Sequence, residues 1–428
     1  MIEMKKYKLG DIAEIQTGPF GSQLHNEDYV QDGTPIVTVE HLGSKEFSTQ
    51  NLPLVSNEDK HRLHKYILKE NDIVFSRVGS VDRCSFVSKK EDGWLFSGRC
   101  LRVRPKSIVN AEYLYYLLCT DSMKSFIRNK AVGATMPSLN TELLSNLPVT
   151  LLPLPVQHKI ASVLSSLDKK IALNKQINQN LEALARQLFD YWFVQFDFPD
   201  ANGKPYKSSG GKMVYNPILK REIPEGWEGV VLRDVIQHIN TGLNPRDNFT
   251  FGGEIKYITV KNLTKDGYID FSSCDTIDED ARCKVHTRSQ IEVGDILYAS
   301  ICPLGRTYLI TEEPNDWDIN ESVFSIRPNY KKITSEYLNM LLKDDYYIAK
   351  LSNSSTGSIF LGIRIKQLES TQILLPSYNI LSAFTKQIKD IVRLQANNYQ
   401  QILSLTKQRD ELLPLLMNGQ VNFDLSDD

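Results

Sequence analysis

Several features are missing from this sequence, and each absence excludes a class of protein. No run of about eighteen apolar residues occurs, so no stretch is suited to span a membrane as a helix. The N-terminal segment up to Gly18 lacks the apolar core of a signal peptide. The six cysteines include no C-x-x-C pair, so neither a zinc site nor a disulfide framework is predicted. We therefore expect a soluble, cytoplasmic protein with no membrane partner and no metal.

A strong charge of either sign is also missing. Fifty basic and 52 acidic residues give a net charge of -2, so the chain as a whole is not attracted to nucleic acid. Binding to DNA or RNA would have to come from local clusters of basic residues. The length of 428 residues is too great for one core and suits two domains.

A long stretch from Gln157 to Val194 contains neither proline nor glycine and follows the Leu-Pro-Leu-Pro sequence at 152–155, which we interpret as a stop. Its apolar positions recur at alternating spacings of three and four, which predicts a long helix that packs against another helix. A second such seam follows 224 residues later. The predicted seam residues are Ile160, Leu164, Leu167, Ile171, Asn178, Leu181 and Leu188 in the first helix, and Ile388, Ile391, Asn398, Ile402, Leu405 and Leu412 in the second.

The region between the two seams is duplicated as well. Asp72-Ile-Val-Phe matches Asp295-Ile-Leu-Tyr, and Arg104-Pro105 matches Arg327-Pro328, both at an offset of 223. Thr17-Gly18 matches Thr241-Gly242 at an offset of 224. Matches that keep their order at a nearly constant offset indicate an internal duplication.

Each copy reads as a mixed α+β domain followed by one long helix. Short β-rich runs, such as 35–39, 72–76 and 100–104, are separated by turn residues, and one helix follows a polar cap at Asn110 or Thr334. We therefore predict domain 1 over 1–153, a helix over 154–195, a connector over 196–228, domain 2 over 229–376, a second helix over 377–420 and a tail over 421–428.

With these features the chain resembles the DNA-specificity subunits of Type I restriction–modification systems. The resemblance is carried by KLGDIAEIQTGPFGSQL (8–24), ENDIVFSRVGSVDR (70–83), LPLPVQHKIASVLSSLDKKI (152–171), and KPYKSSGGKMVYN with REIPEGW in the connector. It implies two target-recognition domains separated by two antiparallel coiled-coil helices. It also implies double-stranded DNA with a split recognition sequence as target, and two modification subunits that methylate adenine with S-adenosylmethionine. Restriction subunits would complete the complex.

We expect the chain itself to bind no cofactor and to catalyse nothing. An adenine methyltransferase of this kind needs an Asp/Asn-Pro-Pro-Tyr/Phe turn, but no Pro-Pro pair occurs, and no phosphate-binding glycine loop is present. Asp247, Glu254 and Lys256 loosely imitate a nuclease metal site, but the first copy has no equivalent. The alternatives are therefore a single-chain restriction nuclease or methyltransferase, and a coiled-coil adaptor that binds only proteins.

Two groups of basic residues form the candidate DNA surface. One is a duplicated basic loop that suits contacts to phosphates: Lys60, Arg62 and Lys65 in the first copy, and Arg282, Lys284 and Arg288 in the second. The other flanks the turn after the Asp-Ile strand: Arg77, Arg83 and Arg306, which could reach guanine edges in the major groove. For each group the alternative is structural, namely a solvated basic turn or a salt bridge.

Two further features carry open alternatives. The loop at 18–22 approaches a DNA backbone closely or is a turn that needs positive φ at glycine. If the two helices run antiparallel, facing residue numbers sum to about 576, which places Asn178 opposite Asn398. A buried asparagine pair of this kind would fix register; otherwise these positions face water.

Overall fold

The computed structural model describes residues 4–19, 23–133, 136–245, 249–354 and 362–421. The chain divides into two compact units, Met1–Ala172 with Leu403–Asp428, and Leu173–Ile402. Each unit holds one α+β domain and part of both long helices.

The first unit is built on a four-stranded antiparallel sheet in the order β2-β9-β6-β7. Its strands are β2 (Ala13–Thr17), β9 (Cys100–Pro105), β6 (Ile73–Ser76) and β7 (Cys84–Phe86). A second sheet has the order β3-β5-β4-β8, with β3 (Tyr29–Val30), β5 (Leu54–Val55), β4 (Thr34–Val37) and β8 (Leu95–Phe96). The predicted strands at 72–76 and 100–104 therefore match β6 and β9, and β4 covers most of 35–39.

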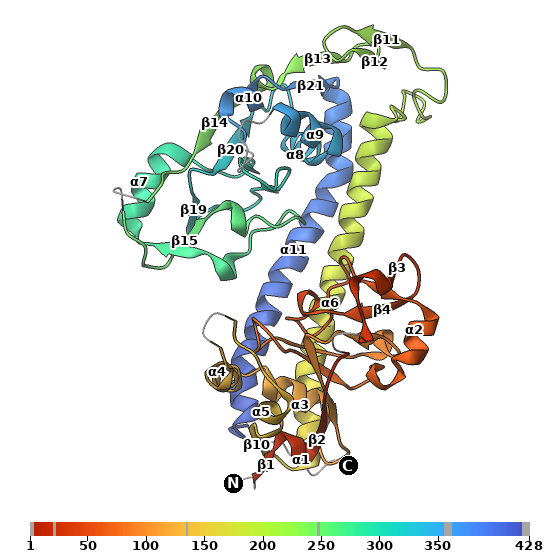
Figure 1. Ribbon diagram of the computed structural model, residues 1–428. Coiled ribbons are helices and arrows are strands. Elements are labelled where there is room, and N and C mark those ends of the chain that lie inside the picture. Colours follow the sequence, from red (N-terminus) through yellow and green to blue (C-terminus); the bar gives the residue numbers. More distant parts are fainter. Residues whose placement is uncertain (1–3, 20–22, 134–135, 246–248, 355–361, 422–428) are drawn as a thin grey trace. The chain divides into compact units, whose positions relative to one another are not determined.

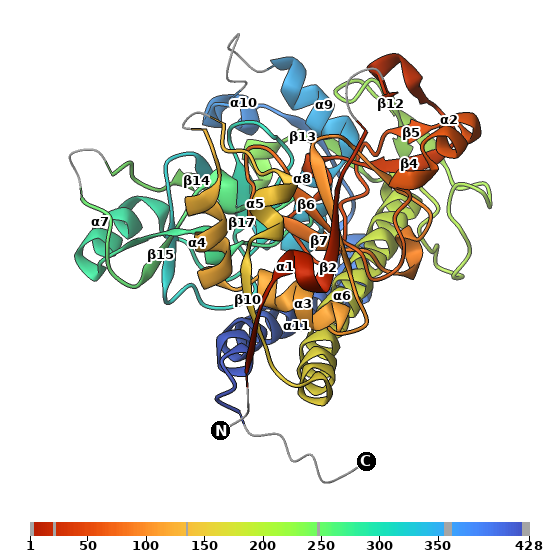
Figure 2. The same ribbon diagram turned by 60° about the horizontal axis from the view of Figure 1, so that its bottom comes forward.

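Helices cover the main sheet of this unit, and β1 (Lys5–Lys8) pairs with β10 (Pro148–Leu151) beside α1 and α5, as Figure 2 shows. The predicted helix after Asn110 is α3, and the Asn110 side chain accepts a hydrogen bond from the Tyr113 N–H. The helical elements are α1 (Leu9–Ile12), α2 (Asn57–Arg62), α3 (Ala111–Leu118), α4 (Asp121–Lys130), α5 (Thr141–Ser145) and the short η2 (Asn26–Asp28), η3 (Val39–His41), η4 (His64–Tyr66) and η5 (Lys89–Glu91).

The second unit repeats this order of elements. Its main sheet is β14-β20-β17-β18, with β14 (Ile236–Thr241), β20 (Val323–Pro328), β17 (Ile296–Ala299) and β18 (Thr307–Leu309). The smaller sheet is β16-β15-β19, with β16 (Asp275–Ile277), β15 (Ile255–Ile258) and β19 (Trp317–Ile319), and β13 (Glu228–Val231) pairs with β21 (Gln372–Leu375). The helical elements are η7 (Leu232–Val235), η8 (Val260–Asn262), η9 (Phe271–Ser273), α7 (Glu279–Ser289), α8 (Ser335–Lys343), α9 (Asp345–Ser354) and α10 (Ile365–Glu369).

The duplicated Asp and Arg-Pro motifs form the same buried ion pair in both units. Arg104 donates to both carboxylate oxygens of Asp72 at 2.7 Å. Arg327 does the same to Asp295 at 2.8 and 2.9 Å. Both carboxylates are buried, so each is stabilised by a guanidinium group that donates to both of its oxygens. The motifs thus repeat because they hold the sheet together.

The two long helices are α6 (Leu154–Phe189), which continues into the π-helical η6 (Asp190–Val194), and α11 (Tyr378–Met417). They lie side by side and antiparallel in each unit (Figure 1): Arg409 meets Asp168 in the first unit, and Asn398 meets Asn178 in the second. The helix α6 begins at Leu154, so the Leu-Pro-Leu-Pro sequence at 152–155 is not a stop throughout: its second proline, Pro155, lies in the first helical turn, where proline is tolerated. All thirteen predicted seam residues are buried or half-buried.

The connector is ordered and belongs to the core of the second unit. It contains a hairpin of β11 (Met213–Asn216) and β12 (Arg221–Pro224). Phe196, Phe198 and Trp227 are buried in the core, and the Phe198 and Trp227 rings stack at 4.8 Å between centroids. No helix in the described ranges is both long and apolar enough to cross a bilayer.

Candidate nucleic-acid interface

The basic segments predicted to be loops are helical. In α2 the Ser56 side chain caps the helix by accepting from the Asp59 N–H at 3.0 Å, and in α7 Asp278 accepts from Ala281 at 2.8 Å. Acidic residues fill the first turn and basic residues the last turn of each helix. This is the arrangement that the helix dipole favours. The capping residue and the acidic turn were visible in the sequence and would have corrected the prediction.

At the basic end of α2 the three predicted residues are placed differently. The Arg62 guanidinium binds Asp59 Oδ1 at 2.6 Å and the Gln23 carbonyl oxygen at 2.7 Å, so it ties α2 to the segment after β2. Its hydrogen bond lowers the pKa of Asp59. Lys65 is exposed with its ammonium 5.0 Å from the Tyr66 ring centre, and Lys60 is half-buried. Both lysines keep a charge that can meet a phosphate.

The basic residues of α7 follow the same division. Arg282 is half-buried and donates to Glu279 at 3.2 Å and to the Pro314 carbonyl at 3.1 Å. Lys284 and Arg288 are exposed, and Arg288 donates to the Thr241 hydroxyl at 3.3 Å. Arg288 therefore lies beside the C-terminal end of β14, just as Arg62 lies beside the segment after β2.

The His286 side chain, also on α7, has a buried partner. Its Nδ1 lies 3.1 Å from Asp318 Oδ2, and burial raises the pKa of Asp318 while the bonds from the Ile319 N–H and His286 oppose that rise. Its sequence counterpart His64 instead has Nδ1 3.1 Å from the His61 carbonyl oxygen. The two histidines occupy matching places in the sequence but make different contacts.

The arginines after the Asp-Ile strands lie at one edge of each main sheet. Arg77 is half-buried and donates to the Gly98 carbonyl at 3.2 Å. Arg83 is exposed, and its side chain lies beside Gly43, where an added Cβ would be 3.6 Å from Arg83 Cδ. Arg306 is half-buried and donates to the Leu263 carbonyl at 2.9 Å. Of the three, Arg83 is the arginine most open to a partner.

The register of the strands shows why these residues come together. Thr17 pairs with Leu101 and Ser76 with Cys100, so the end of β2, the end of β6 and the start of β9 share one edge. The exposed Arg99, which was not among the predicted residues, directly precedes β9 on this edge. A signal was present, because an arginine just before a predicted strand must lie at the end of that strand.

The same edge of the second unit is far less basic. The counterparts of Arg77 and Arg99 at the offset of 223 are Ser300 and Ser322. The Ser300 hydroxyl donates to the Ser322 carbonyl oxygen at 2.7 Å. The two domains thus share a fold but present different chemistry at this edge.

Close packing explains the duplicated Thr-Gly turn. A Cβ on Gly18 would lie 2.1 Å from the Ser97 carbonyl oxygen, and one on Gly242 would lie 1.6 Å from that of Ile319. Neither glycine has positive φ, so of the two interpretations of the loop at 18–22, the turn that needs positive φ does not apply at Gly18. The rest of the predicted loop, 20–22, lies outside the described residues.

The alternative interpretation of Asp247, Glu254 and Lys256 as a nuclease metal site gains no support from the structure. Glu254 is exposed and Lys256 is half-buried in β15, while Asp247 lies outside the described residues. In the described part of the chain, no group of three or more His, Cys, Asp and Glu side chains is arranged to hold a metal ion.

Comparison with known proteins gives one family. The Type I restriction modification DNA specificity domain matches residues 1–183 and 224–412. The Type I restriction enzyme MjaIX specificity subunit of Methanocaldococcus jannaschii is 30% identical over 329 residues, which cover 74% of this chain and 70% of the relative. The HindI specificity subunit of Haemophilus influenzae is 24% identical over 474 residues, covering 98% and 100%. The crystal structure of the Type-I restriction-modification S subunit from M. genitalium has the same fold, with a TM-score of 0.58 and 16% identity over 97% of this chain and 96% of that one.

Proposed function

Because this chain belongs to the family of Type I restriction–modification DNA specificity subunits, whose task is to recognise a DNA sequence, we propose that it reads a target in two parts, one half by each domain. Family membership favours this function over a single-chain nuclease or methyltransferase and over a coiled-coil adaptor. The DNA would lie along the sheet edges that carry Arg83 and Arg306.

The observation that carries the proposal is a duplicated fold with unlike edges. Both domains present a capped basic helix, α2 or α7, which suits contacts to phosphates of any sequence. At the adjoining edge, arginines at 77 and 99 in one domain are replaced by serines in the other. Arginine prefers guanine, whereas serine bonds to several bases, so the two edges favour different half-sites.

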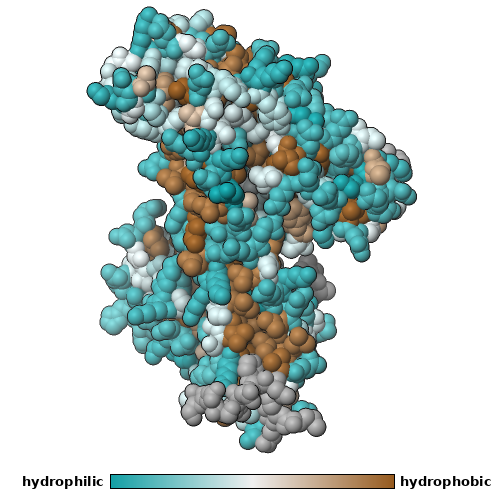
Figure 3. All heavy atoms as spheres, turned by 180° about the vertical axis from the view of Figure 1, so that it is seen from behind, coloured by the Kyte–Doolittle hydropathy of each residue, from teal (hydrophilic) through white to brown (hydrophobic). Residues whose placement is uncertain are grey.

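The finer proposal concerns the partners. Two modification subunits that use S-adenosylmethionine would bind this chain and methylate adenine, and restriction subunits would join them. Within the second unit, α6 leaves Leu173, Ile177 and Leu184 exposed. Figure 3 shows apolar surface on the face of the molecule hidden in Figure 1. Exposed apolar side chains along one helix are typical of protein contacts and support a scaffolding role.

The test is methylome sequencing of a host that carries this chain with its modification subunit. We expect a split motif with an unread gap and a methylated adenine on each strand. A continuous motif, or no methylation that depends on this chain, would contradict the proposal.

Two single-residue variants test which domain reads which half-site. R83A should relax one base position in one half-site, at a cost of about 1–3 kcal/mol in discrimination, and leave the other half unchanged. R306A should act on the other half-site, but partly through the fold, because Arg306 also bonds to the Leu263 carbonyl. R393A is the matched control, since Arg393 is exposed on α11 and pairs with Asp390 there. It should leave both halves unchanged.

A further inference from the structure

A closed turn after η8 carries an aromatic ring of the second domain onto α11. Thr264 and Tyr268 close the turn, with the Thr264 N–H donating to the Tyr268 carbonyl at 2.9 Å. The Tyr268 ring stacks on the Tyr399 ring of α11 with centroids 4.4 Å apart and planes 8° apart. The Tyr399 hydroxyl in turn donates to the Ile269 carbonyl. The nearly parallel ring stack and the hydrogen bond together hold the turn against α11.

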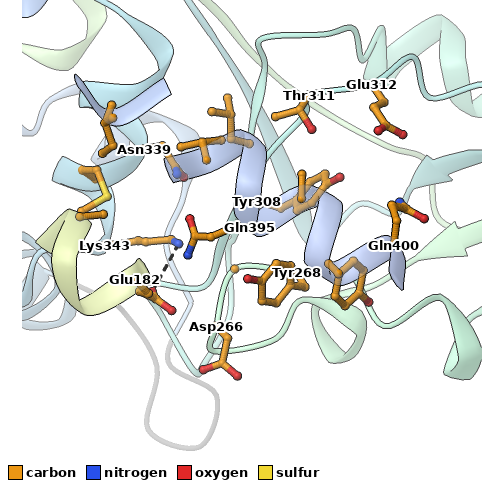
Figure 4. Close-up of a pocket in the computed structure, with 18 residues that line it drawn as sticks. Glu182, Asp266, Tyr268, Tyr308, Thr311, Glu312, Asn339, Lys343, Gln395 and Gln400 are labelled. Carbon is orange, nitrogen blue, oxygen red and sulfur yellow. Dashed lines mark ion pairs between the residues drawn. The ribbon is translucent and has the colours of Figure 1, made fainter. Parts of the chain in front are cut away.

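An ion pair between α8 and α6 lies against the same turn. Lys343 of α8 lies 3.7 Å from Glu182 of α6, and Figure 4 shows the two side chains pointing toward each other beside Asp266 and Tyr268. Gly267 has φ +78°, and a Cβ there would lie 2.5 Å from Lys343 Nζ. The turn is therefore packed against the ammonium group. A cavity of about 80 Å³ remains between these groups, too small for anything beyond a few waters.

The first domain fixes its matching turn to the helices by charge instead. Lys45, which follows η3, donates to Glu112 at 2.8 Å and to the Tyr116 hydroxyl at 2.9 Å. Its ammonium lies 3.9 Å from Asp168 of α6, and Asp168 accepts from Arg409 of α11 at 3.0 Å. The chain of contacts thus runs from the turn through α6 to α11 inside the first unit.

Each turn also touches the arginine of its sheet edge. Arg306 donates to the carbonyl of Leu263, the residue before Thr264, and Arg83 lies beside Gly43, two residues before Lys45. In both units, therefore, one short turn lies between an edge arginine and the helix pair.

We propose that the turns 42–45 and 263–268 are positioning elements that fix the orientation of each recognition domain on the helices, with Lys45, Asp168, Tyr268 and Tyr399 as positioning residues. These residues read no base themselves. By holding each domain in one orientation they determine which gap length between the half-sites the complex accepts. This inference rests on the proposed function, because a gap exists only if the target is split.

The experiment uses the full chain assembled with its modification subunit, on a DNA library whose two half-sites are constant and whose gap varies by one base pair at a time. Y399A removes the stack and the hydrogen bond to Ile269, whereas Y399F removes the hydrogen bond alone. We expect wild type to prefer one gap length. For each protein we take the ratio of binding at the preferred gap to binding at gaps one base pair longer or shorter. In Y399A this ratio should fall about tenfold, the order expected for loss of a stacked aromatic pair. Y399F should keep most of the preference.

A second library with the gap constant and each half-site randomised supplies the readout that a general loss of stability would not give. Y399A should retain the wild-type base preferences in both halves. R393A, on an exposed face of the same helix, should behave as wild type in both libraries. If Y399A does not assemble, gap preference and base preference are compared in the same two libraries for Y268L on the turn and for D168N in the first unit.

The outcomes separate the inference from the proposed function. If wild type shows no split motif, the proposed function is wrong. If wild type is split but the assembled variants keep the full gap preference, the positioning role is wrong. Loss of base preference together with gap preference would also overturn it, because the turns would then act on reading itself.

Discussion

The asparagine pair between the long helices gives the sharpest test of what fixes their register. In the second unit the Asn178 amide donates to the Gln395 carbonyl at 3.2 Å, and its oxygen accepts from Asn398 at 3.0 Å. The Asn178 side chain is buried among the seam residues. We consider N178L, N398L and the double variant, which change one, the other or both polar side chains to the apolar type that fills most of this seam.

The single and double changes should have opposite effects. N178L leaves the half-buried Asn398 amide without the acceptor that it has in wild type, at a cost of about 1–3 kcal/mol. The double variant removes both side-chain amides of the pair and places two apolar side chains in the seam. Each apolar side chain is worth about 1.5–3 kcal/mol when fully buried. We therefore expect the double variant to be at least as stable as wild type, with a coupling energy in the range of about 0.5–3 kcal/mol.

The assay is native-state hydrogen exchange of backbone amides along 173–189 and 391–402, because local opening energies avoid the assumption that a two-domain chain unfolds in one step. N180L is the matched control: Asn180 is exposed on the same helix and accepts from Gln176 at 3.4 Å. Its effect should stay within about 0.5 kcal/mol. Additive destabilisation in the double variant would refute this reasoning, since it would mean that the asparagines do not stabilise each other.

Three further predictions concern function. The chain alone should transfer no methyl group, and adding the modification subunit should give transfer at two adenines per site; turnover of S-adenosylmethionine by the chain alone would contradict this. Changing Lys60 and Lys65 to alanine should weaken binding about equally across sequences, and the log–log salt slope should fall by roughly 0.9 for each phosphate that the variant no longer neutralises. A seven-residue insertion in both helices keeps the heptad register and adds about 10 Å, or roughly three base pairs, so a randomised-gap selection should reject the original gap.

Much of the fold followed from the sequence because duplication supplied an internal comparison. The Asp72 and Arg104 motifs and their copies marked the same strands twice, and the caps at Asn110 and Thr334 marked the same helix twice. The sequence at 152–155 was interpreted as a stop although Pro155 lies in the first turn of α6, because proline is found both in first turns and at breaks. The helices α2 and α7 were not predicted, because the interpretation considered only their basic residues and not their acidic first turns and capping residues.

The site was harder to predict because sequence does not say which contacts a side chain already has. Arg62 was assigned to phosphate, yet its guanidinium binds Asp59 and the Gln23 carbonyl. The turn-to-helix contacts join residues more than a hundred positions apart, as with Tyr268 and Tyr399. One of them could have been found. The rule that facing residue numbers sum to about 576, which placed Asn178 opposite Asn398, also places Asp168 opposite Arg409, a charged pair in a mostly apolar seam.

The two copies can also be used to separate residues that build the fold from residues that distinguish one DNA half-site from the other. Positions that are the same in both copies and buried, such as Asp72 and Asp295, hold structure in each. Basic residues present in both copies, on α2 and α7, suit contacts that are independent of sequence, because both domains must hold the same phosphate backbone. Only positions that differ between the copies at the sheet edge can tell one half-site from the other. By this reasoning Arg77 and Arg99, whose counterparts are serines, are stronger candidates for distinguishing the two half-sites than Arg83, whose counterpart is also an arginine.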